Sequence, residues 1–410
     1  MYDQSFNSKS LSSLLKQEDL THVPFDSFEL FKESTIKHSL FLLKNDQSKL
    51  FSIKKIYLKN KPAYTTPILS DEIIIRKISQ NIKSIRKCKS TSRAFVILNL
   101  KSLLSEGIPY RIYRLDIENF YESIDTLELI SLINRNEYLS NDTKNLLENL
   151  LVKLQAHGNT GLPRGMAISA ILSDIAMQDF DEFAKNMENV FFYARYVDDI
   201  IIITNSSEND HNFVQNLENK LPPKLTFHKK GLKFKILSLP LSEKKGTSTS
   251  PTPVGDINYL GYNFDIYEPY NGSKHGDRRP LKISISNTKI SKIKTRITKS
   301  FLIYKKDHNS ALLLSRIKFL TSNFHITNKT DNRRKLSGIY FNYPFINNTQ
   351  CLSQLDSYLR KTVFLNGQYL SSKSKRQLLS FSFLKGHKLK IFAHFHSSLL
   401  HEIQRCWKYE

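Results

Sequence analysis

Two adjacent aspartates between two β-rich runs place the strongest constraint on how this chain can fold. Asp198 and Asp199 follow Tyr193–Val197 and precede four consecutive isoleucines at 200–203. We interpret the stretch as a strand, a two-residue turn and a second strand, with both carboxylates at the tip of the hairpin. Paired carboxylates repel each other unless a cation lies between them, and a divalent metal with oxygen ligands is the obvious candidate. An ordinary turn, in which aspartate is common, is the alternative.

The charge of the chain limits the classes of partner. Its 410 residues include 61 Lys and Arg against 38 Asp and Glu, a formal net charge of +23. This charge favours a polyanionic partner, either nucleic acid or an acidic membrane face. The three scattered cysteines form neither a disulfide framework nor a zinc motif, which suits a reducing cytosol. Without a signal-peptide pattern or an apolar run approaching ~18 residues, a cytoplasmic protein with no membrane span is expected.

A third aspartate ends another β-run, Tyr110–Asp116. If this strand and the aspartate hairpin are neighbours in one sheet, Asp116, Asp198 and Asp199 converge on one spot. Three such carboxylates suit two Mg²⁺ ions ~3.5–4 Å apart in phosphoryl transfer. One ion would lower the pKa of a primer 3′-hydroxyl, and the other would hold the triphosphate and neutralise the departing pyrophosphate.

The rest of the chain is predicted to be mostly helical from its apolar spacing and turn residues. Helices are expected from residue 70 onward and over 93–105, 127–138, 141–156, 168–185, 207–221, 289–299 and much of 310–410. Strands are expected over 225–230 and 257–264, the second with a glycine inside it. A polar loop at 243–255 should be exposed and mobile. The helices within 70–105 and at 289–299 are basic, which suits phosphate contact but is also common on surface helices.

Four short motifs occur in a fixed order along the chain. They are Asp116 with Phe120-Tyr121, Gly161-Leu162-Pro163-Arg164-Gly165, Tyr196-Val197-Asp198-Asp199 and Tyr259-Leu260-Gly261-Tyr262. This order resembles the palm motifs of reverse transcriptases, and the resemblance covers residues 60–300. It implies an α+β right-hand polymerase (fingers, palm and thumb) with a helical C-terminal extension. The implied activity is RNA-directed DNA polymerase, a nucleotidyltransferase that uses dNTPs and two Mg²⁺ ions.

The resemblance also implies roles for individual residues. Asp116 and Asp198 would be the main catalytic metal ligands, with Asp199 a weaker one and the carbonyl of Ile117 a further ligand. Tyr121 matches the aromatic gate that rejects a ribose 2′-hydroxyl. The other implied roles are the nucleotide floor (Pro163, Gly165), the lysine that protonates pyrophosphate (Lys229 or Lys230), the primer grip (Tyr259, Leu260, Gly261) and finger contacts to template or triphosphate (Arg76, Arg93).

One residue departs from the family pattern. Many reverse transcriptases have glutamine at the position of Arg164. An arginine there can contact a phosphate or a base edge of the substrate, or point away, so template reading at this position is an open question. There are alternatives at other positions too. Tyr121 can be an ordinary core residue, and Lys229 and Lys230 can be solvated lysines.

The resemblance implies a division of the chain into four parts. Residues 1–69 would form an N-terminal extension and the start of the fingers, and 70–109 the fingers. Residues 110–270 would form the palm with inserted helices and the 243–255 loop. Residues 280–410 would form a basic helical thumb and C-terminal extension.

A short, solitary polymerase of this kind resembles the prokaryotic defence-associated reverse transcriptases. The segments 3–6 (Asp-Gln-Ser-Phe), 161–170 and 337–340 (Ser-Gly-Ile-Tyr) are most similar to the smaller polymerase of the type 3, two-polymerase systems. That resemblance implies antiviral (anti-phage) defence, a structured non-coding RNA as template, a DNA product, and a second reverse transcriptase or oligomer as partner. The alternatives are a template-independent or protein-primed DNA polymerase and, from another class, a catalytically silent RNA-binding scaffold.

Overall fold

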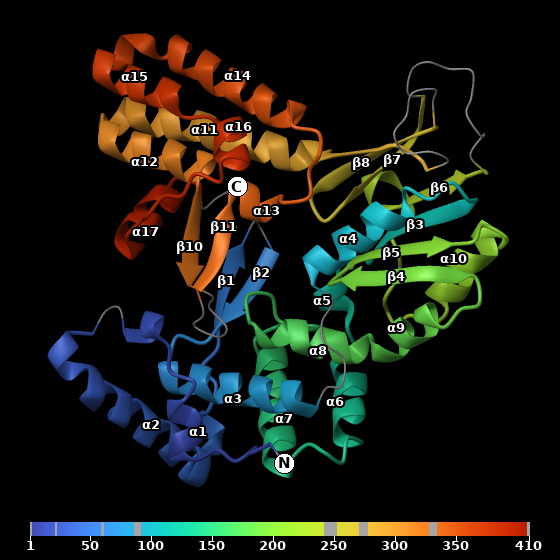
Figure 1. The fold of residues 1–410 in the computed structure, drawn as a ribbon. Helices are drawn as coiled ribbons and strands as arrows, with labels where there is room; N and C mark the ends of the chain where they lie inside the picture. The colour runs from blue at the N-terminus through green and yellow to red at the C-terminus, as the bar shows by residue number, and fades with distance from the viewer. Residues whose placement is uncertain are drawn as a thin grey trace. The chain divides into compact units, whose positions relative to one another are not determined.

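The chain folds into two compact units, each with its own hydrophobic core (Figure 1). The computed structural model describes residues 2–20, 23–58, 61–85, 92–241, 252–269, 278–327 and 334–407. The first unit comprises Met1–Ser92 and Pro109–Ser238, and the second comprises Arg93–Ile108 and Leu239–Glu410. Both helices and sheets occur in each unit, which confirms the predicted α+β class. The fingers, palm and thumb boundaries stay predictions.

The first unit is built around a four-stranded sheet with the strand order β4-β5-β3-β6. Strand β5 pairs antiparallel with β3 on one side and with β4 on the other. The hairpin predicted around the paired aspartates, and its pairing with the strand that ends at Asp116, are therefore confirmed. Its two-residue turn is Val197-Asp198 and not the predicted Asp198-Asp199, because Asp199 already pairs with Tyr196 and begins β5. All four isoleucines of β5 are buried, which fixes the strand firmly in the sheet. The strands are β3 (Tyr110–Asp116), β4 (Val190–Tyr196), β5 (Asp199–Thr204) and β6 (Lys235–Leu239).

Helices with apolar faces pack with this sheet in one core. Ile78, Leu150, Leu172 and Ile202 from four different elements lie in that core, and burial of such a side chain contributes about 1.5–3 kcal/mol. The helices are α1 (Ser8–Ser12), α2 (Phe28–Asn45), α3 (Leu69–Ile85), α5 (Phe120–Ser123), α6 (Thr126–Asn134), α7 (Asn141–Ala156), α8 (Ile168–Ala176), α9 (Gln178–Lys185) and α10 (Asp210–Glu218). A separate hairpin joins β1 (Lys54–Leu58) to β2 (Lys61–Thr65), and 3₁₀ turns lie at η1 (Gln17–Leu20), η2 (Phe25–Ser27), η3 (Gln47–Lys49) and η4 (Gly231–Lys233).

Two predictions in this unit are wrong in detail. The helix expected over 168–185 is two helices, α8 and α9, which meet at Met177. The strand expected over 225–230 is reduced to one isolated bridge between Phe227 and Ile117. That bridge is formed by His228 N–H with the carbonyl of Asp116 and by Glu118 N–H with the carbonyl of Thr226, both at 2.9 Å, while Phe227 N–H donates to the Glu218 carboxylate at 3.3 Å.

The second unit combines a three-stranded antiparallel sheet with a group of helices (Figure 1). Its strands are β7 (Pro253–Tyr259), β8 (Tyr262–Tyr267) and β9 (Leu281–Ile285), and a two-stranded hairpin joins β10 (Asn323–Thr327) to β11 (Arg334–Gly338). Its helices are α4 (Arg93–Leu103), α11 (Asn287–Asp307), α12 (Ser310–Thr321), α13 (Ile339–Asn342), α14 (Gln350–Leu365), α15 (Ser372–Ser380), α16 (Phe383–Lys388) and α17 (Ser397–Arg405), with the 3₁₀ turn η5 (Gly367–Tyr369).

The glycine expected inside a strand at 257–264 lies instead in a tight turn between β7 and β8. Leu260 and Gly261 both have positive φ, 45° and 84°, which is the requirement of a two-residue hairpin turn. The predicted loop at 243–255 lies outside the described residues up to 251, and Pro253 already begins β7. Strand β9 and the β10–β11 hairpin were not predicted. In the part of the chain that the structure describes, no helix is long and apolar enough to span a membrane.

Candidate active site

The sheet register brings the three predicted aspartates to one end of the central strands. Asp116 is the last residue of β3 and pairs directly with Asp199, the first residue of β5. Asp198 lies in the turn between β4 and β5, and its carbonyl accepts a hydrogen bond of 3.2 Å from the N–H of Ile117. Asp116 thus becomes a neighbour of the Asp198-Asp199 pair because β3 and β5 are antiparallel and in this register.

The turn that carries Asp198 is held by a buried arginine. Val197 has φ of 64°, a conformation that is uncommon for a β-branched residue. Arg195 donates from Nη1 to the Val197 carbonyl at 3.0 Å. The same guanidinium forms two hydrogen bonds of 2.7 Å with the Asp181 carboxylate, and its side chain is only 5% exposed. This buried ion pair fixes the base of the aspartate turn.

Burial and mutual repulsion raise the pKa values of the hairpin carboxyls. Burial is the main cause of the raised pKa of Asp198, and the negative charge of Asp116 raises it further. Burial also raises the pKa of Asp199, against which the positive charge of Arg114, whose Nη2 lies 3.5 Å from Oδ1, acts in the opposite direction. The site therefore favours positive charge placed beside its carboxylates.

Asp116 is contacted by two basic side chains from the segment between α10 and β6. Lys233 Nζ lies 2.6 Å from Asp116 Oδ1, and His228 Nε2 lies 3.2 Å from the same oxygen. The other ring nitrogen of His228 lies 3.1 Å from Glu118 Oε1. The result is a short chain of charged and polar groups that runs from Glu118 through His228 to Asp116 and Lys233.

The sequence prediction missed this lysine and the histidine. It assigned Lys229 or Lys230 to the site, whereas the lysine bonded to Asp116 is Lys233. The only local signal is Gly231, whose φ of 84° starts the η4 turn and redirects the chain before Lys233. The pyrophosphate role of Lys229 or Lys230 stays a prediction.

The carboxylates have the donor chemistry of a divalent-cation site. Carboxylate and carbonyl oxygens are the ligands that Mg²⁺ prefers. The ammonium of Lys233 at 2.6 Å from Asp116 shows that a cation is stable against this oxygen. Within the described ranges, no group of three or more His, Cys, Asp or Glu side chains is arranged to hold a metal without rearrangement. The residues fit such an ion chemically, while the side-chain rotamers do not form a complete ligand set.

The predicted gate residue, Tyr121, lies beside these carboxylates on the short helix α5. The pKa of its hydroxyl is raised by burial first and then by the negative charges of Asp198 and Asp174. Its ring packs against Phe120, with 5.4 Å between ring centroids, and joins the edge of the core. Tyr121 is thus a partly buried core residue and a neighbour of Asp198 at the same time.

The 161–165 loop lies against the backbone of that helix. Leu162 N–H donates to the carbonyl of Tyr121 at 2.7 Å. A Cβ at Gly161 would lie 2.4 Å from the same carbonyl oxygen, so only glycine fits there. Ser169 Oγ donates to the carbonyl of Pro163 at 2.6 Å, and Gly165 has a positive φ of 91°. These contacts join the loop to α5 on one side and to α8 on the other.

The structure also shows where the Arg164 side chain points. Its Nε and Nη2 both donate to the Glu122 carboxylate, and Nη2 lies 3.0 Å from Oε2. The carbonyl of Arg164 accepts a 2.7 Å hydrogen bond from Tyr64 N–H on β2. Arg164 therefore faces the residue next to Tyr121.

Other predicted site residues have well-defined partners. In the first unit, Arg76 donates to both carboxylate oxygens of Asp19, at 2.6 and 3.0 Å. In the second unit, Arg93 Nε donates to the carbonyl of Leu260 at 3.0 Å, and its guanidinium lies 4.9 Å from the centroid of the Tyr262 ring. Arg93 thus supports the turn of the predicted primer grip. Contact of either arginine with template or triphosphate stays a prediction.

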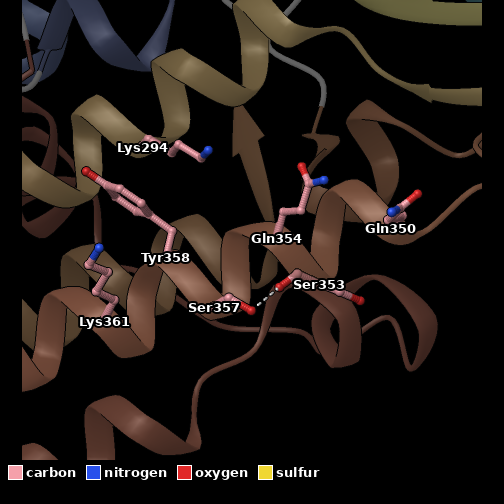
Figure 2. Close-up of a pocket in the computed structure, with 7 residues that line it drawn as sticks. All are labelled: Lys294, Gln350, Ser353, Gln354, Ser357, Tyr358 and Lys361. Atoms are coloured by element: carbon pink, nitrogen blue, oxygen red, sulfur yellow. Dashed lines mark hydrogen bonds between the residues drawn. The ribbon is translucent and has the colours of Figure 1, made fainter.

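A cavity on the second unit has a different character from the aspartate site. It measures ≈ 420 Å³ and lies between α11 and α14 (Figure 2). In Figure 2, Lys294 of α11 faces a row of side chains on α14, where Ser357 Oγ donates to the Ser353 carbonyl at 3.0 Å. Among the described residues that line the cavity none is acidic, and none is a predicted metal ligand. The lining residues are Lys294, Gln350, Ser353, Gln354, Ser357, Tyr358 and Lys361.

The first unit holds three aspartates at one end of a sheet in which β4, β5 and β3 are antiparallel. A family model described as "Reverse transcriptase (RNA-dependent DNA polymerase)" matches residues 36–264, more than half of the chain. The chain therefore belongs to the reverse transcriptase family. A search of curated proteins found no match.

Membership confirms the predicted enzyme class, an RNA-dependent DNA polymerase. It implies a nucleic-acid template, dNTP substrates and a divalent metal, which polymerases of this family generally use. The match extends across the three aspartates, the 161–165 loop and the Tyr259–Gly261 turn, all of which lie within residues 36–264.

Proposed function

We propose that Asp116, Asp198 and Asp199 are the catalytic carboxylates of RNA-templated DNA synthesis. The observation that carries the proposal is the pairing of Asp116 with Asp199 across β3 and β5, with Asp198 in the adjoining turn. Asp116, Asp198 and the carbonyl of Ile117 would hold two Mg²⁺ ions, with Asp199 as a weaker contributor. When bound, these ions supply the charge that lowers the pKa of a primer 3′-hydroxyl and neutralises the departing pyrophosphate.

The surrounding residues would orient the substrates. Tyr121 would stand against the sugar and reject a ribose 2′-hydroxyl, because it is partly buried and adjacent to Asp198. Pro163 and Gly165 would form the floor beneath the nucleotide. A lysine from the segment before β6 would meet the pyrophosphate, and Lys233 is better placed than Lys229 or Lys230 because its ammonium lies 2.6 Å from Asp116. Tyr259, Leu260 and Gly261 would support the primer, and Arg76, Arg93 and Arg164 remain candidates for substrate contact.

Primer extension tests the carboxylate assignment. Purified full-length protein with Mg²⁺, a primed RNA template and labelled dNTPs should make DNA. The Asp198→Ala/Asp199→Ala double variant should lose this synthesis, whereas Asp142→Ala/Asp179→Ala, which removes two exposed carboxylates on α7 and α9, should retain it. Retained synthesis in the first double variant would overturn the assignment.

We further propose that the polymerase acts in antiviral defence, templated by a structured non-coding RNA and paired with a second reverse transcriptase. The proposal is supported by the motif resemblance, and two of its segments make specific contacts. Gln4 accepts from Ser140 N–H at 2.8 Å and donates to the Tyr138 carbonyl. Gly338 lies so close to Asn323 that a Cβ would be 2.4 Å from its Cα. The contacts of Gln4 and Gly338 within the fold are therefore a second reason for these two residue types, besides the resemblance.

Phage challenge tests the defence role. Cells that express the chain with its neighbouring genes should form fewer plaques, and the Asp198→Ala/Asp199→Ala variant should lose protection. Protection by the double variant would favour the silent-scaffold alternative.

Sequencing of the RNA and DNA that co-purify with the full chain tests the template. A templated enzyme should yield DNA complementary to one bound RNA, and synthesis should stop after RNase treatment until a template is added. Synthesis that continues without any template would favour the template-independent or protein-primed alternative.

A further inference from the structure

Glu122 and Arg164 form an ion pair directly beside the predicted gate residue. Arg164 binds the carboxylate through two nitrogens, an arrangement that fixes the plane of both groups as well as their distance. Both side chains are about one-third exposed, at 29% for Glu122 and 33% for Arg164. Although partial burial acts to raise the pKa of the Glu122 carboxyl, the hydrogen bond and charge of Arg164 hold it below its usual value, so the carboxylate is ionised at neutral pH.

The ion pair is the side-chain part of a larger attachment between α5 and the 161–165 loop. The backbone part consists of the Leu162 N–H bond to the Tyr121 carbonyl and the close contact of Gly161 with the carbonyls of Tyr121 and Glu122. On its other side, the loop is tied to β2 through the Arg164 carbonyl and Tyr64 N–H. Helix α5 has only four residues, and its N-cap, Asn119, has φ of 41° and makes no side-chain cap bond. So short a helix needs outside contacts to hold its orientation.

We propose that the Arg164–Glu122 pair positions Tyr121 and thereby sets how strongly the enzyme rejects ribonucleotides. The inference rests on the proposed gate role of Tyr121. A gate works by a steric clash, and displacements of about 1 Å are enough to change such a contact strongly. Arg164 touches the helical turn that carries the gate, and in this role it positions Tyr121 without contacting the sugar. Glutamine at position 164 cannot form the same charged, two-point contact.

The test compares the use of deoxy- and ribonucleotides by the full-length protein. For each variant, kcat/KM is measured for one dNTP and for the matching rNTP on the same primed template. Arg164→Gln and Glu122→Gln should each reduce the dNTP preference by about fivefold, the upper range for a partly exposed ion pair. The change should appear in the ratio of the two kcat/KM values, with rNTP use rising relative to dNTP use. The double variant should lose no more than either single variant, because both act through one contact.

Two further variants complete the experiment. Glu33→Gln breaks an exposed ion pair on α2, between Glu33 and Lys37, and should leave the dNTP preference unchanged. Tyr121→Ala should reduce the preference more than any change at 122 or 164. If Tyr121→Ala reduces the preference for dNTP but Arg164→Gln does not, Tyr121 is the gate and the inference that Arg164 positions it is wrong. If Tyr121→Ala leaves the preference unchanged, the gate itself is wrong.

Two more results would contradict the positioning inference and leave the gate role of Tyr121 untouched. Arg164→Gln that reduces dNTP and rNTP use equally would show that Arg164 contacts a part common to both substrates. Additive losses in the double variant would likewise show that Arg164 and Glu122 act separately.

Discussion

At the scale of single residues, Lys233 is the side chain most closely tied to the candidate metal ligands. Its ammonium lies 2.6 Å from Asp116, and it is half exposed, so it can move toward a substrate. We expect Lys233→Ala to reduce kcat by about 10²-fold, the lower end of what a positioned proton donor contributes. Single-turnover primer extension measures this effect. Lys229→Ala and Lys230→Ala are the matched controls. A larger loss of kcat in either one would assign the protonation of pyrophosphate to that lysine, as the sequence predicts.

The raised pKa of Asp198 has a consequence for stability. A carboxyl with a raised folded-state pKa binds its proton more tightly in the folded protein than in the unfolded chain. The folded protein therefore loses stability as the pH rises from the unfolded-state pKa of ~3.9 through the raised value. Asp198→Asn should therefore raise the melting temperature at pH 7, by about 2–4 °C for each 1 kcal/mol gained. The advantage over the wild type should shrink as the pH is lowered toward 4.

Mg²⁺ should stabilise the wild-type protein at pH 7, where the charge of Asp198 alone destabilises it. An ion that binds only the folded protein stabilises it by mass action, so Mg²⁺ should raise the melting temperature of the wild type more than that of Asp198→Asn. Equal Mg²⁺ effects on the two proteins would contradict the role of Asp198 as a ligand, and an unchanged melting temperature at pH 7 would contradict the charge repulsion.

At the scale of elements, the close contact between the 161–165 loop and α5 predicts a strong dependence on one glycine. In Gly161→Ala the new methyl group would meet two backbone carbonyl oxygens, at 2.4 and 2.5 Å, so loop and helix must separate. We expect a stability loss of about 1–3 kcal/mol, the usual range for overpacking, together with reduced polymerase activity. Denaturant unfolding and primer extension measure the two effects.

Gly231→Ala is the matched control. Gly231 has a positive φ of 84° but no atom within 4 Å of a new Cβ. It should therefore cost only the backbone strain of about 1–2 kcal/mol. Equal stability losses in the two variants would mean that contact with α5 is not what makes Gly161 necessary.

The sequence predicts elements well where local pattern and tertiary pairing agree. The aspartate hairpin was predicted because two β-rich runs flank a two-residue turn, and the structure pairs those runs as expected. The Leu260-Gly261 turn was missed because leucine with positive φ is rare, so the segment resembled one continuous strand. The strand over 225–230 is reduced to one bridge because β3 ends at Asp116, Phe227 N–H donates to the Glu218 side chain, and the η4 turn begins at Gly231.

The same distinction applies to the site. Asp116, Asp198, Asp199 and Tyr121 were predicted because each lies in a recognisable motif. Lys233 and the partner of Arg164 could not be predicted, since neither contact is local. Lys233 is 117 residues from Asp116 in sequence, and Arg164 is 42 residues from Glu122. Only the folded chain shows which side chain meets which.

At the scale of the whole molecule, the charge of +23 should appear as a steep salt dependence of nucleic-acid binding. Each phosphate contact releases a counterion, so log K should fall linearly with log[salt], with a slope of about −0.7 per contact for a single strand. On α11, Lys289→Gln/Lys292→Gln should make this slope less negative by about 0.7 for each lysine that contacts phosphate. The control Lys37→Gln/Lys44→Gln removes the same charge from α2. Binding of labelled RNA at several salt concentrations measures the slopes. A slope that becomes less negative by the same amount in both double variants would mean that the basic composition acts through net charge. A change confined to the α11 variant would identify that helix as a nucleic-acid contact.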